Sequence, residues 1–495
     1  MEAAKAFRNG LPYHVALAGV TSQPARLLGL GHRVGKIAEG FDADILVWDS
    51  DPLSVGAAPV QVWIDGAPQF KNPVVLDKPW AKLLDEPVLE TYTEQKTLSS
   101  DSITVFTGLT NVQLPSHSIS TTFAASSPAT MILTNGNITC LGPDCVQPSS
   151  GKIKHIALTD GHLTAPFTAF GSSLGLSEID AETATQDGYN DAPLFSRTID
   201  GLALSGKQLA ATFAKGVTRA VTAPLAGGVR GGGGYRGVSA AFKTGALNSL
   251  EEGAVIKDEV AVHYELTGSV KHSDKTTSIS SAVGALRKSL LDAIASNATI
   301  SSADKYSEAA YLKRVINGSL PLVLHAHSAD TIAAIIRLKA ELSSHPLRVI
   351  IHGGAESHIV ASALSSANIP VVLAPLLAYS QSWDQRRSLT GAPLTNGTAI
   401  DALLSAGVKV AIGPHEAWEA RDLPLMAGVA LANGLGEGRL EYEGAMGLIG
   451  ANLYEMLGLE EEEKGEEWVL FEGSPLEIQG RVRAVGEKGR VSVWE

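Results

Sequence analysis

Cysteine, long apolar runs and clustered positive charge are all scarce in this chain of 495 residues. Only two cysteines occur, and no apolar run reaches the roughly 20 residues that a membrane-spanning helix needs. The net charge is −13 and no basic cluster is present, which argues against binding to nucleic acid or to anionic membranes. Hydrophobic residues make up 44% and charged residues 18% of the chain, as in an ordinary globular protein.

The two cysteines, Cys140 and Cys145, lie close together in the segment CLGPDC. They are interpreted either as two separate thiols or as a small local disulfide, since Gly142 and Pro143 form a turn between them. A metal site is not expected here because no further ligands lie nearby. Chance alone gives a few N-x-[ST] triplets in a chain of this length, so they hint only weakly at a secretory route and the localisation stays unknown. These triplets begin at Asn137, Asn297, Asn317 and Asn396.

The stretch 321–375 carries the clearest secondary-structure pattern in the chain. Three short apolar runs alternate with two amphipathic segments, which predicts a βαβαβ unit. The runs show no polar alternation, so they are predicted to be buried parallel strands. The predicted strands are 322–324, 349–351 and 371–373, and the predicted helices are 329–342 and 357–367.

Histidines follow the first two predicted strands of this unit. His325 and His327 are two residues apart, so an extended chain points both side chains the same way, and His352 ends the next strand. In a parallel α/β barrel, residues at the carboxyl ends of the strands face the active site. Imidazole is a common ligand for zinc and similar metals. The alternative is a set of buried, hydrogen-bonded polar side chains, and the residues alone leave both interpretations open.

Residues 25–66 read ARLLGLGHRVGKIAEGFDADILVWDSDPLSVGAAPVQVWIDG. A helix-like stretch at 15–30 precedes two strand runs, 44–48 and 60–64, and Asp65-Gly66 is a hairpin-turn signal. This segment is too short to bury a core of its own. It resembles the closing segment of the metal-dependent amidohydrolase superfamily, in which a last helix leads into a small β-sandwich.

The resemblance implies that the barrel belonging to this closing segment lies upstream of it, so an upstream amidohydrolase-like unit is an expected partner. The C-terminus repeats the pattern, because WVLFEGSPLE matches ILVWDSDPLS in its apolar run, its acid and its turn. An acidic turn at 460–467 precedes it, and the acidic run 460–463 is predicted to be a solvated loop. The segment TNGNITCLG at 134–142 is similar to the strands that precede the barrel in this family.

The predicted fold is therefore α/β, a TIM-like (β/α)8 barrel with a small composite β-sandwich and an N-terminal fragment of a second β-sandwich. The branches it resembles are the imidazolonepropionase-like and N-acetylglucosamine-6-phosphate deacetylase-like ones. The predicted divisions are a tail of an upstream unit at 1–70, a linker at 71–101, a barrel at 164–437, and a composite β-sandwich at 102–163 and 438–495.

Amidohydrolases hold one or two divalent metals at the barrel mouth, which activate a water and polarise the scissile carbonyl. The resemblance implies that His325 is the strand-five ligand, His327 a supporting or substitute ligand, and His352 the strand-six ligand. Strand one departs from the family, since Gly171 and Ser173 stand where the pattern has His-x-His. The first metal position has thus lost both anchors.

Strand eight departs as well, because this chain has Gly413-Pro414-His415 where the family has an aspartate. His415 is predicted to be a metal ligand and, with Glu416, a catalytic residue. The implied cofactor is one divalent metal, and zinc is the metal that three imidazoles and a water suit. A barrel without metal is the alternative. Other candidates for the strand-eight acid and for the strand-four ligand are Glu419, Asp422, Lys257, Glu259 and His263.

Two loops complete the predicted barrel mouth. Trp383 and Arg386 follow the strand at 371–373 and are predicted to bind a small-molecule substrate; the alternative is a surface loop with an internal ion pair. The glycine-rich stretch 227–237 lacks the ending of a phosphate loop and is predicted to be a mobile loop.

Two functions follow from these patterns. The first is a metal-dependent hydrolase of non-peptide carbon–nitrogen bonds, such as amides or N-acetyl groups. The second is a catalytically degenerate barrel that stabilises or regulates the upstream unit. Fold alone does not separate the two, because function depends on the site.

Overall fold

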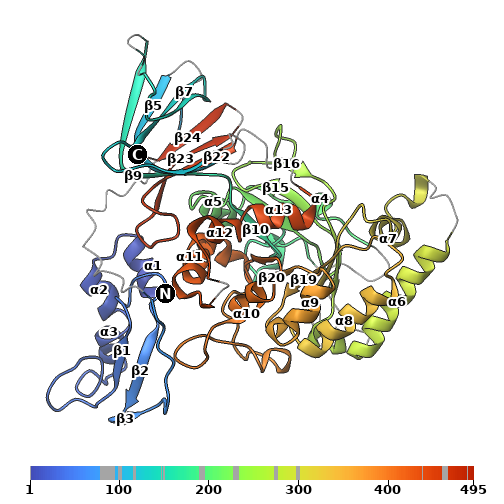
Figure 1. Ribbon diagram of the computed structural model, residues 1–495, viewed down its shortest axis with the longest axis horizontal. Helices are drawn as coiled ribbons and strands as arrows, with labels where there is room; N and C mark the ends of the chain where they lie inside the picture. The colour runs from blue at the N-terminus through green and yellow to red at the C-terminus, as the bar shows by residue number, and fades with distance from the viewer. Residues whose placement is uncertain are drawn as a thin grey trace.

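The computed structural model (Figure 1) describes most of the chain, including nearly all of the predicted barrel. The predicted linker is described only at 71–78 and 95–98, and the acidic run 460–463 lies outside the described residues. The described residues are 2–78, 95–98, 103–114, 119–146, 148, 151–188, 195–226, 234–272, 277–296, 302–436, 439–459, 467–487 and 489–494.

The N-terminal segment forms three short helices and a three-stranded antiparallel sheet. Both predicted strand runs are confirmed, and positive φ angles at Asp65 (49°) and Gly66 (75°) form the predicted hairpin turn. The predicted single helix at 15–30 is instead two helices separated by a turn at 19–21. The elements are α1 (Glu2–Arg8), α2 (Tyr13–Ala18), α3 (Ser22–Leu27), β1 (Ile45–Trp48), β2 (Pro59–Ile64) and β3 (Ala67–Pro68).

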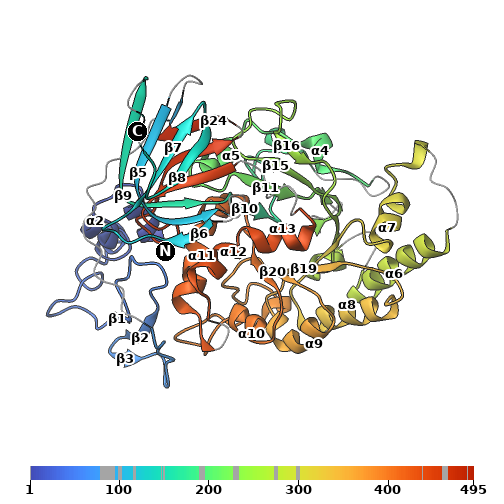
Figure 2. The same ribbon diagram turned by 45° about the horizontal axis from the view of Figure 1, so that its top comes forward.

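A nine-stranded sheet combines strands from residues 95–164 with strands from the C-terminal residues 467–494 (Figure 2). Its strands run in the order β4-β24-β23-β22-β9-β5-β7-β8, and β6 pairs with β5. Cys140, on β8, forms a disulfide with Cys145, so the two cysteines are not separate thiols. The strands are β4 (Gln95–Thr97), β5 (Ile103–Leu114), β6 (Ile119–Thr122), β7 (Ala129–Thr134), β8 (Asn137–Gly142), β9 (Ile153–Thr164), β22 (Glu467–Glu472), β23 (Arg481–Glu487) and β24 (Arg490–Trp494).

Two further sheets occupy the middle of the chain. In the larger one, β17 to β21 are all parallel, which confirms the strands and the βαβαβ unit predicted for 321–375. In the smaller one, β10 and β11 are parallel. The two sheets contain β10 (Thr168–Phe170), β11 (Arg219–Thr222), β14 (Gly237–Val238), β15 (Ala240–Lys243), β16 (Val255–Lys257), β17 (Val262–Glu265), β18 (Leu322–Ala326), β19 (Val349–Gly353), β20 (Val371–Leu373) and β21 (Val410–Ile412).

The chain between β11 and β17 departs from an all-parallel barrel. β15 is antiparallel to β11, and β14 is antiparallel to β17. The described part of the connection from β11 to β15 contains no helix, whereas a parallel return usually runs through a crossover helix. Part of the predicted mobile loop is here a strand pair, β12 (Leu225–Ala226) with β13 (Gly234–Tyr235), and residues 227–233 lie outside the described part.

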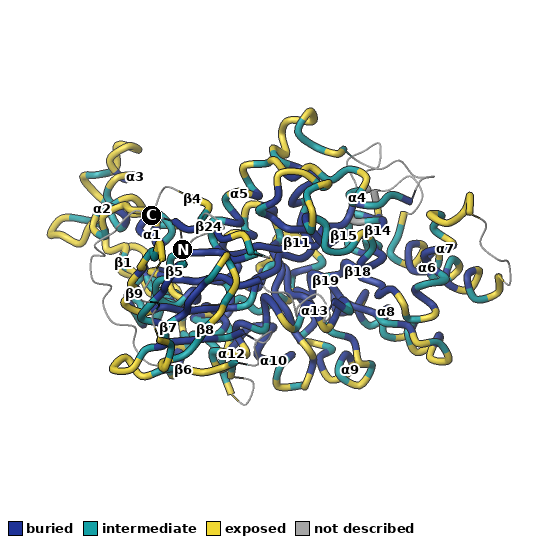
Figure 3. The backbone as a smooth tube through the Cα atoms, turned by 90° about the horizontal axis from the view of Figure 1, so that it is seen from above, coloured by how far each residue is buried: buried dark blue, intermediate teal, exposed yellow. Residues whose placement is uncertain are grey.

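Helices lie outside these two sheets, and the strands at the centre are buried (Figure 3). Buried apolar side chains pack between the helices and the sheets. A separate buried cluster takes one residue each from β10, β11, β15, β18, β19, β20 and β21, with Ala261 before β17, and α13 closes one end of it. None of the described helices has the length and hydropathy needed to cross a membrane. The remaining α-helices are α4 (Thr198–Gly201), α5 (Lys207–Phe213), α6 (Ile279–Ala295), α7 (Glu308–Ile316), α8 (Ala329–Glu341), α9 (Ala361–Ser366), α10 (Ala399–Ser405), α11 (Leu423–Asn433), α12 (Tyr442–Gly447) and α13 (Ala451–Leu457).

A buried charge cluster ties the nine-stranded sheet to the smaller central sheet. Glu467 on β22 accepts a hydrogen bond from Arg219 Nε at 2.7 Å and pairs with Lys243 Nζ at 2.8 Å. Arg219 also donates to the Tyr454 hydroxyl on α13. Burial alone would raise the pKa of Glu467, but the charges of Arg219 and Lys243 outweigh it and lower that pKa. The Glu467 carboxylate therefore links the nine-stranded sheet to the smaller central sheet and, through Arg219, to α13.

Replacing Glu467 by alanine is expected to destabilise the protein by about 3–5 kcal/mol, because two buried cations lose their shared partner. Glu341→Ala is the matched control, since Glu341 forms an exposed ion pair with Arg287 and should cost at most about 1 kcal/mol. Urea denaturation of both variants measures the difference. Equal losses of stability in the two variants would show that the buried Glu467 cluster stabilises the protein no more than an exposed ion pair does.

Candidate functional site

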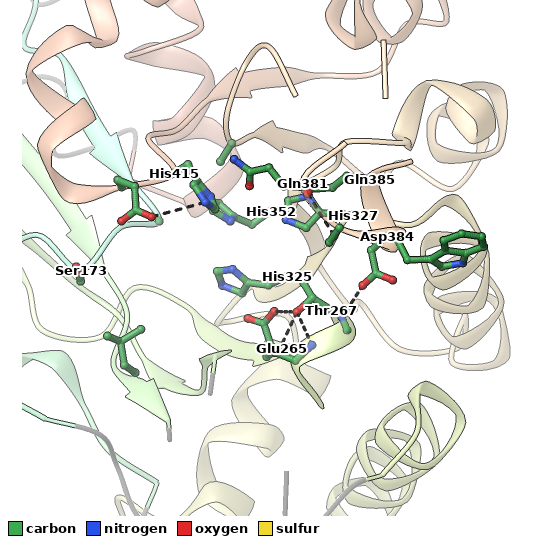
Figure 4. A pocket seen from close by; sticks show the side chains of 18 of the residues that line it. Ser173, Glu265, Thr267, His325, His327, His352, Gln381, Asp384, Gln385 and His415 are labelled. Carbon is green, nitrogen blue, oxygen red and sulfur yellow. Dashed lines mark hydrogen bonds and ion pairs between the residues drawn. The ribbon is translucent and has the colours of Figure 1, made fainter. Parts of the chain in front are cut away.

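One cavity of about 830 Å³ opens at the carboxyl ends of the parallel strands. The labelled side chains surround its central space, with Ser173 set apart from the histidines (Figure 4). The side chains come from β17, β18 and β19 and from the loops that follow β10, β20 and β21. This is the edge of the sheet where the sequence predicts the active site.

Six of the seven predicted site residues line this cavity, and the exception is Arg386. Its guanidinium instead stacks on the Trp383 ring at 4.6 Å, and Nη1 donates to the Trp383 carbonyl at 2.9 Å. Trp383 itself is 75% exposed and lies at the rim. The six lining residues are His325, His327, His352, Trp383, His415 and Glu416.

A chain of hydrogen bonds holds the deepest histidines. His263 Nδ1 lies 3.0 Å from His325 Nε2, and His263 Nε2 lies 2.9 Å from the Ser239 hydroxyl. Both rings are buried. Register explains the contact, because His263 on β17 pairs with Val323 and lies two residues before Glu265, which pairs with His325. Of the three strand-four candidates, only His263 reaches the core of the site.

The other two strand-four candidates lie elsewhere. Lys257 Nζ donates to the Gly458 carbonyl at 3.3 Å, at the far end of the strands. Glu259 is paired with Arg314 and accepts a hydrogen bond from the Tyr311 hydroxyl at 2.7 Å. Both side chains are therefore structural.

Burial keeps the deep imidazoles neutral. It lowers the pKa of His263 and of His352 to about 3 and that of His327 to about 4, and it lowers the pKa of His325 well below its ordinary value. Nearby imidazoles lower these pKa values further. At neutral pH each ring therefore offers one donor and one acceptor nitrogen.

The Gly171 position is closed to a side chain. Gly171 has φ +99°, and a Cβ atom built there would collide with Nε2 of His352. The His352 ring also packs edge-on against Phe170, with ring centroids 5.6 Å apart. The His352 ring thus fills the space that a side chain at residue 171, the first histidine position of strand one, would need.

Acidic side chains also line the cavity, and Glu265 among them was not predicted from the sequence. Glu265 ends β17 and accepts a hydrogen bond from the Thr267 hydroxyl. Asp384 accepts a hydrogen bond from the Gly268 amide at 2.5 Å. The alternation His263-x-Glu265 within a strand could have indicated that both side chains point to the same face.

His415 and Glu416 lie at the rim, with His415 Nε2 3.7 Å from Glu416 Oε1. Burial raises the pKa of Glu416, and the nearby Asp180 and Glu419 raise it further, against the opposing effect of His415. Glu419 accepts a hydrogen bond from the His415 amide at 2.8 Å. Asp422 pairs with Lys5 at 2.9 Å. Glu419 therefore holds the backbone at His415, and Asp422 holds the N-terminal segment. These two acids are the predicted alternatives to Glu416.

The side chains do not fit a bound divalent metal in this arrangement. Within the described residues, no three His, Cys, Asp or Glu side chains form a group that could hold an ion. His325 directs Nε2 to His263, and His352 directs Nε2 to Gly171. The donor chemistry suits zinc, but the convergence that a zinc site requires is lacking among these histidines.

Comparison with known proteins gives the family context. Residues 5–70 match the model of the amidohydrolase family. Over 503 residues the chain is 44% identical to the amidohydrolase tasK of Hapsidospora irregularis, covering 94% of this chain and 50% of tasK. The chain thus spans about half the length of this curated relative.

A solved structure agrees at the level of the fold. The amidohydrolase from Thermotoga maritima superposes with a TM-score of 0.60 at 20% identity, covering 77% of this chain and 97% of that one. At this identity the match shows the fold alone. Over most of its length the chain therefore has a fold similar to that of this solved structure.

Gly171→Ala is expected to destabilise the protein by about 1–3 kcal/mol more than Gly40→Ala. Gly40 has a similar φ of +82° with nothing near its Cβ position, so it controls for backbone strain. The extra cost comes from the His352 ring and should largely disappear when Gly171→Ala is made in a His352→Ala background. Urea denaturation of the four variants measures this coupling. If the effects of Gly171→Ala and His352→Ala on stability were additive, the proposed contact between residue 171 and the His352 ring would be contradicted.

Proposed function

We propose that this chain is a unit of an amidohydrolase-like hydrolase that acts on non-peptide carbon–nitrogen bonds, such as amides or N-acetyl groups, of a small molecule. The observation that carries the proposal is the cavity at the carboxyl ends of the parallel strands, which four histidines line. We further propose that the two central sheets form one (β/α)8 barrel with one reversed strand. The domain divisions predicted from the sequence are part of this proposal.

His415 and Glu416 are the residues proposed to move the proton. Glu416 is the better proton acceptor of the rim acids, because burial raises the pKa of its carboxyl. The neutral imidazoles of His325 and His352 line the floor and can orient a polar group. No step is assigned to a metal, because the described side chains do not converge on one.

The charges of the cavity favour an uncharged or positively charged substrate. Four carboxylates line it, and Lys271 is the one lysine or arginine among the described lining residues. A carboxylate-bearing substrate would meet repulsion from these acids. The acids are Asp180, Glu265, Asp384 and Glu416.

Glu416→Gln and His415→Asn are each expected to lower the rate of amide hydrolysis by about 100-fold or more, because proton transfer is lost. Glu443→Gln, at an exposed position of α12, is the control and should leave the rate unchanged. The assay uses a panel of uncharged, cationic and anionic amides and N-acetyl sugars. Activity that survives in both rim variants would contradict the assignment.

Metal analysis of the purified chain tests the arrangement of the histidines. The expected result is less than one zinc, manganese or iron per chain, with activity unchanged by a chelator. One metal per chain that is lost in His352→Ala would overturn the metal-free arrangement and restore the mononuclear zinc site that the sequence predicts.

A supporting role for an upstream unit is the second candidate. Two observations favour it, the closed position at Gly171 and the exposed apolar side chains on the N-terminal segment. Leu27 is 87%, Ile37 81% and Leu46 51% exposed. Strands of the repeated C-terminal segment are instead covered within the nine-stranded sheet. An inactive chain that becomes active when it is joined to a preceding amidohydrolase-like unit would favour this candidate.

A further inference from the structure

Three cationic side chains meet where the N-terminal segment contacts the loop before β23. Arg8 ends α1 and is 3% exposed. Its Nη2 donates to the Gly480 carbonyl at 3.2 Å, and Nη1 of Arg481 donates to the same oxygen at 3.1 Å. The two guanidinium groups therefore share one neutral acceptor.

Lys215, just beyond α5, is the third member of the cluster. Its Nζ donates to the Asn9 side chain at 3.1 Å, next to Arg8. Burial lowers the pKa of Lys215 to about 8, and the charges of Arg8 and Arg481 add to this effect. Burial also lowers the pKa of Arg8 and that of Arg481 to about 10. The cations thus repel one another in a poorly solvated place.

Acidic side chains do not balance this charge within the described residues. Asp422 is the nearby acid, and it pairs with Lys5 at 2.9 Å. Nε of Arg8 is buried and has no hydrogen-bond partner among the described atoms. Buried cations without a counter-charge are costly, and they stand out in a chain of net charge −13.

We propose that Arg8, Arg481 and Lys215 form a binding site for a small oxyanion, such as phosphate, sulfate or a carboxylate group. Guanidinium groups bind such anions through paired N–H donors, and the ammonium adds a point charge. The three side chains come from the N-terminal segment, the loop after α5 and the start of β23. A bound oxyanion would therefore fasten the N-terminal segment to the body of the protein.

The experiment measures the thermal unfolding midpoint with and without phosphate, on the order of 10 mM, with sodium chloride keeping the ionic strength constant. The wild-type midpoint is expected to rise by several degrees. In Lys215→Gln the rise should be lost or strongly reduced. Without phosphate this variant should be at least as stable as the wild type, because loss of the Lys215 charge relieves its repulsion with Arg8 and Arg481.

Lys207→Gln is the matched control, since Lys207 is an exposed lysine at the start of the same helix. It should keep the full response to phosphate. Sulfate and acetate, used in the same way, distinguish a tetrahedral oxyanion from a carboxylate. An equal response in all three proteins, or no response of the wild type to any of the three anions, would overturn the proposal.

Discussion

The contact between the His352 ring and the Gly171 backbone sets what the cavity can contain. No side chain fits at residue 171 while His352 keeps its position, and a φ of +99° favours glycine there in any case. Strand one therefore contributes no ligand at this point. Whatever chemistry the cavity performs has to come from the strands that follow it and from the loops at the rim.

The two deepest histidines, His263 and His325, are hydrogen-bonded to each other. A buried neutral imidazole needs a partner for each of its two nitrogens. His263 finds both, in Ser239 and His325. A ring that is engaged in this way is positioned by its neighbours and held neutral by burial. His415 and Glu416, by contrast, lie at the rim, where their side chains reach solvent.

Local signals explain which parts of the fold could be predicted. The strands and helices of 321–375 are each indicated by their own composition, so their order and direction could be predicted from the sequence. For Glu265 the sequence indicates only the face that it shares with His263, because its place beside His325 depends on the register between β17 and β18. The reversed strand was missed for a related reason, since its direction depends on how it pairs with β11 and not on its own residues.

The N-terminal segment packs on α11 through its copy of the repeat that the sequence shows. In both copies a turn precedes a buried leucine: the amide of Leu53 donates to Asp51 at 2.8 Å, and that of Leu476 donates to Ser474 at 3.3 Å. Both turns pack on α11, where a Cβ at Gly428 would meet the carbonyl of Leu476 and lie 3.0 Å from Val55. A glycine at this position lets one helix accept both copies. The repeat could be read from the sequence, but this shared helix could not, because it depends on surfaces that are far apart along the chain.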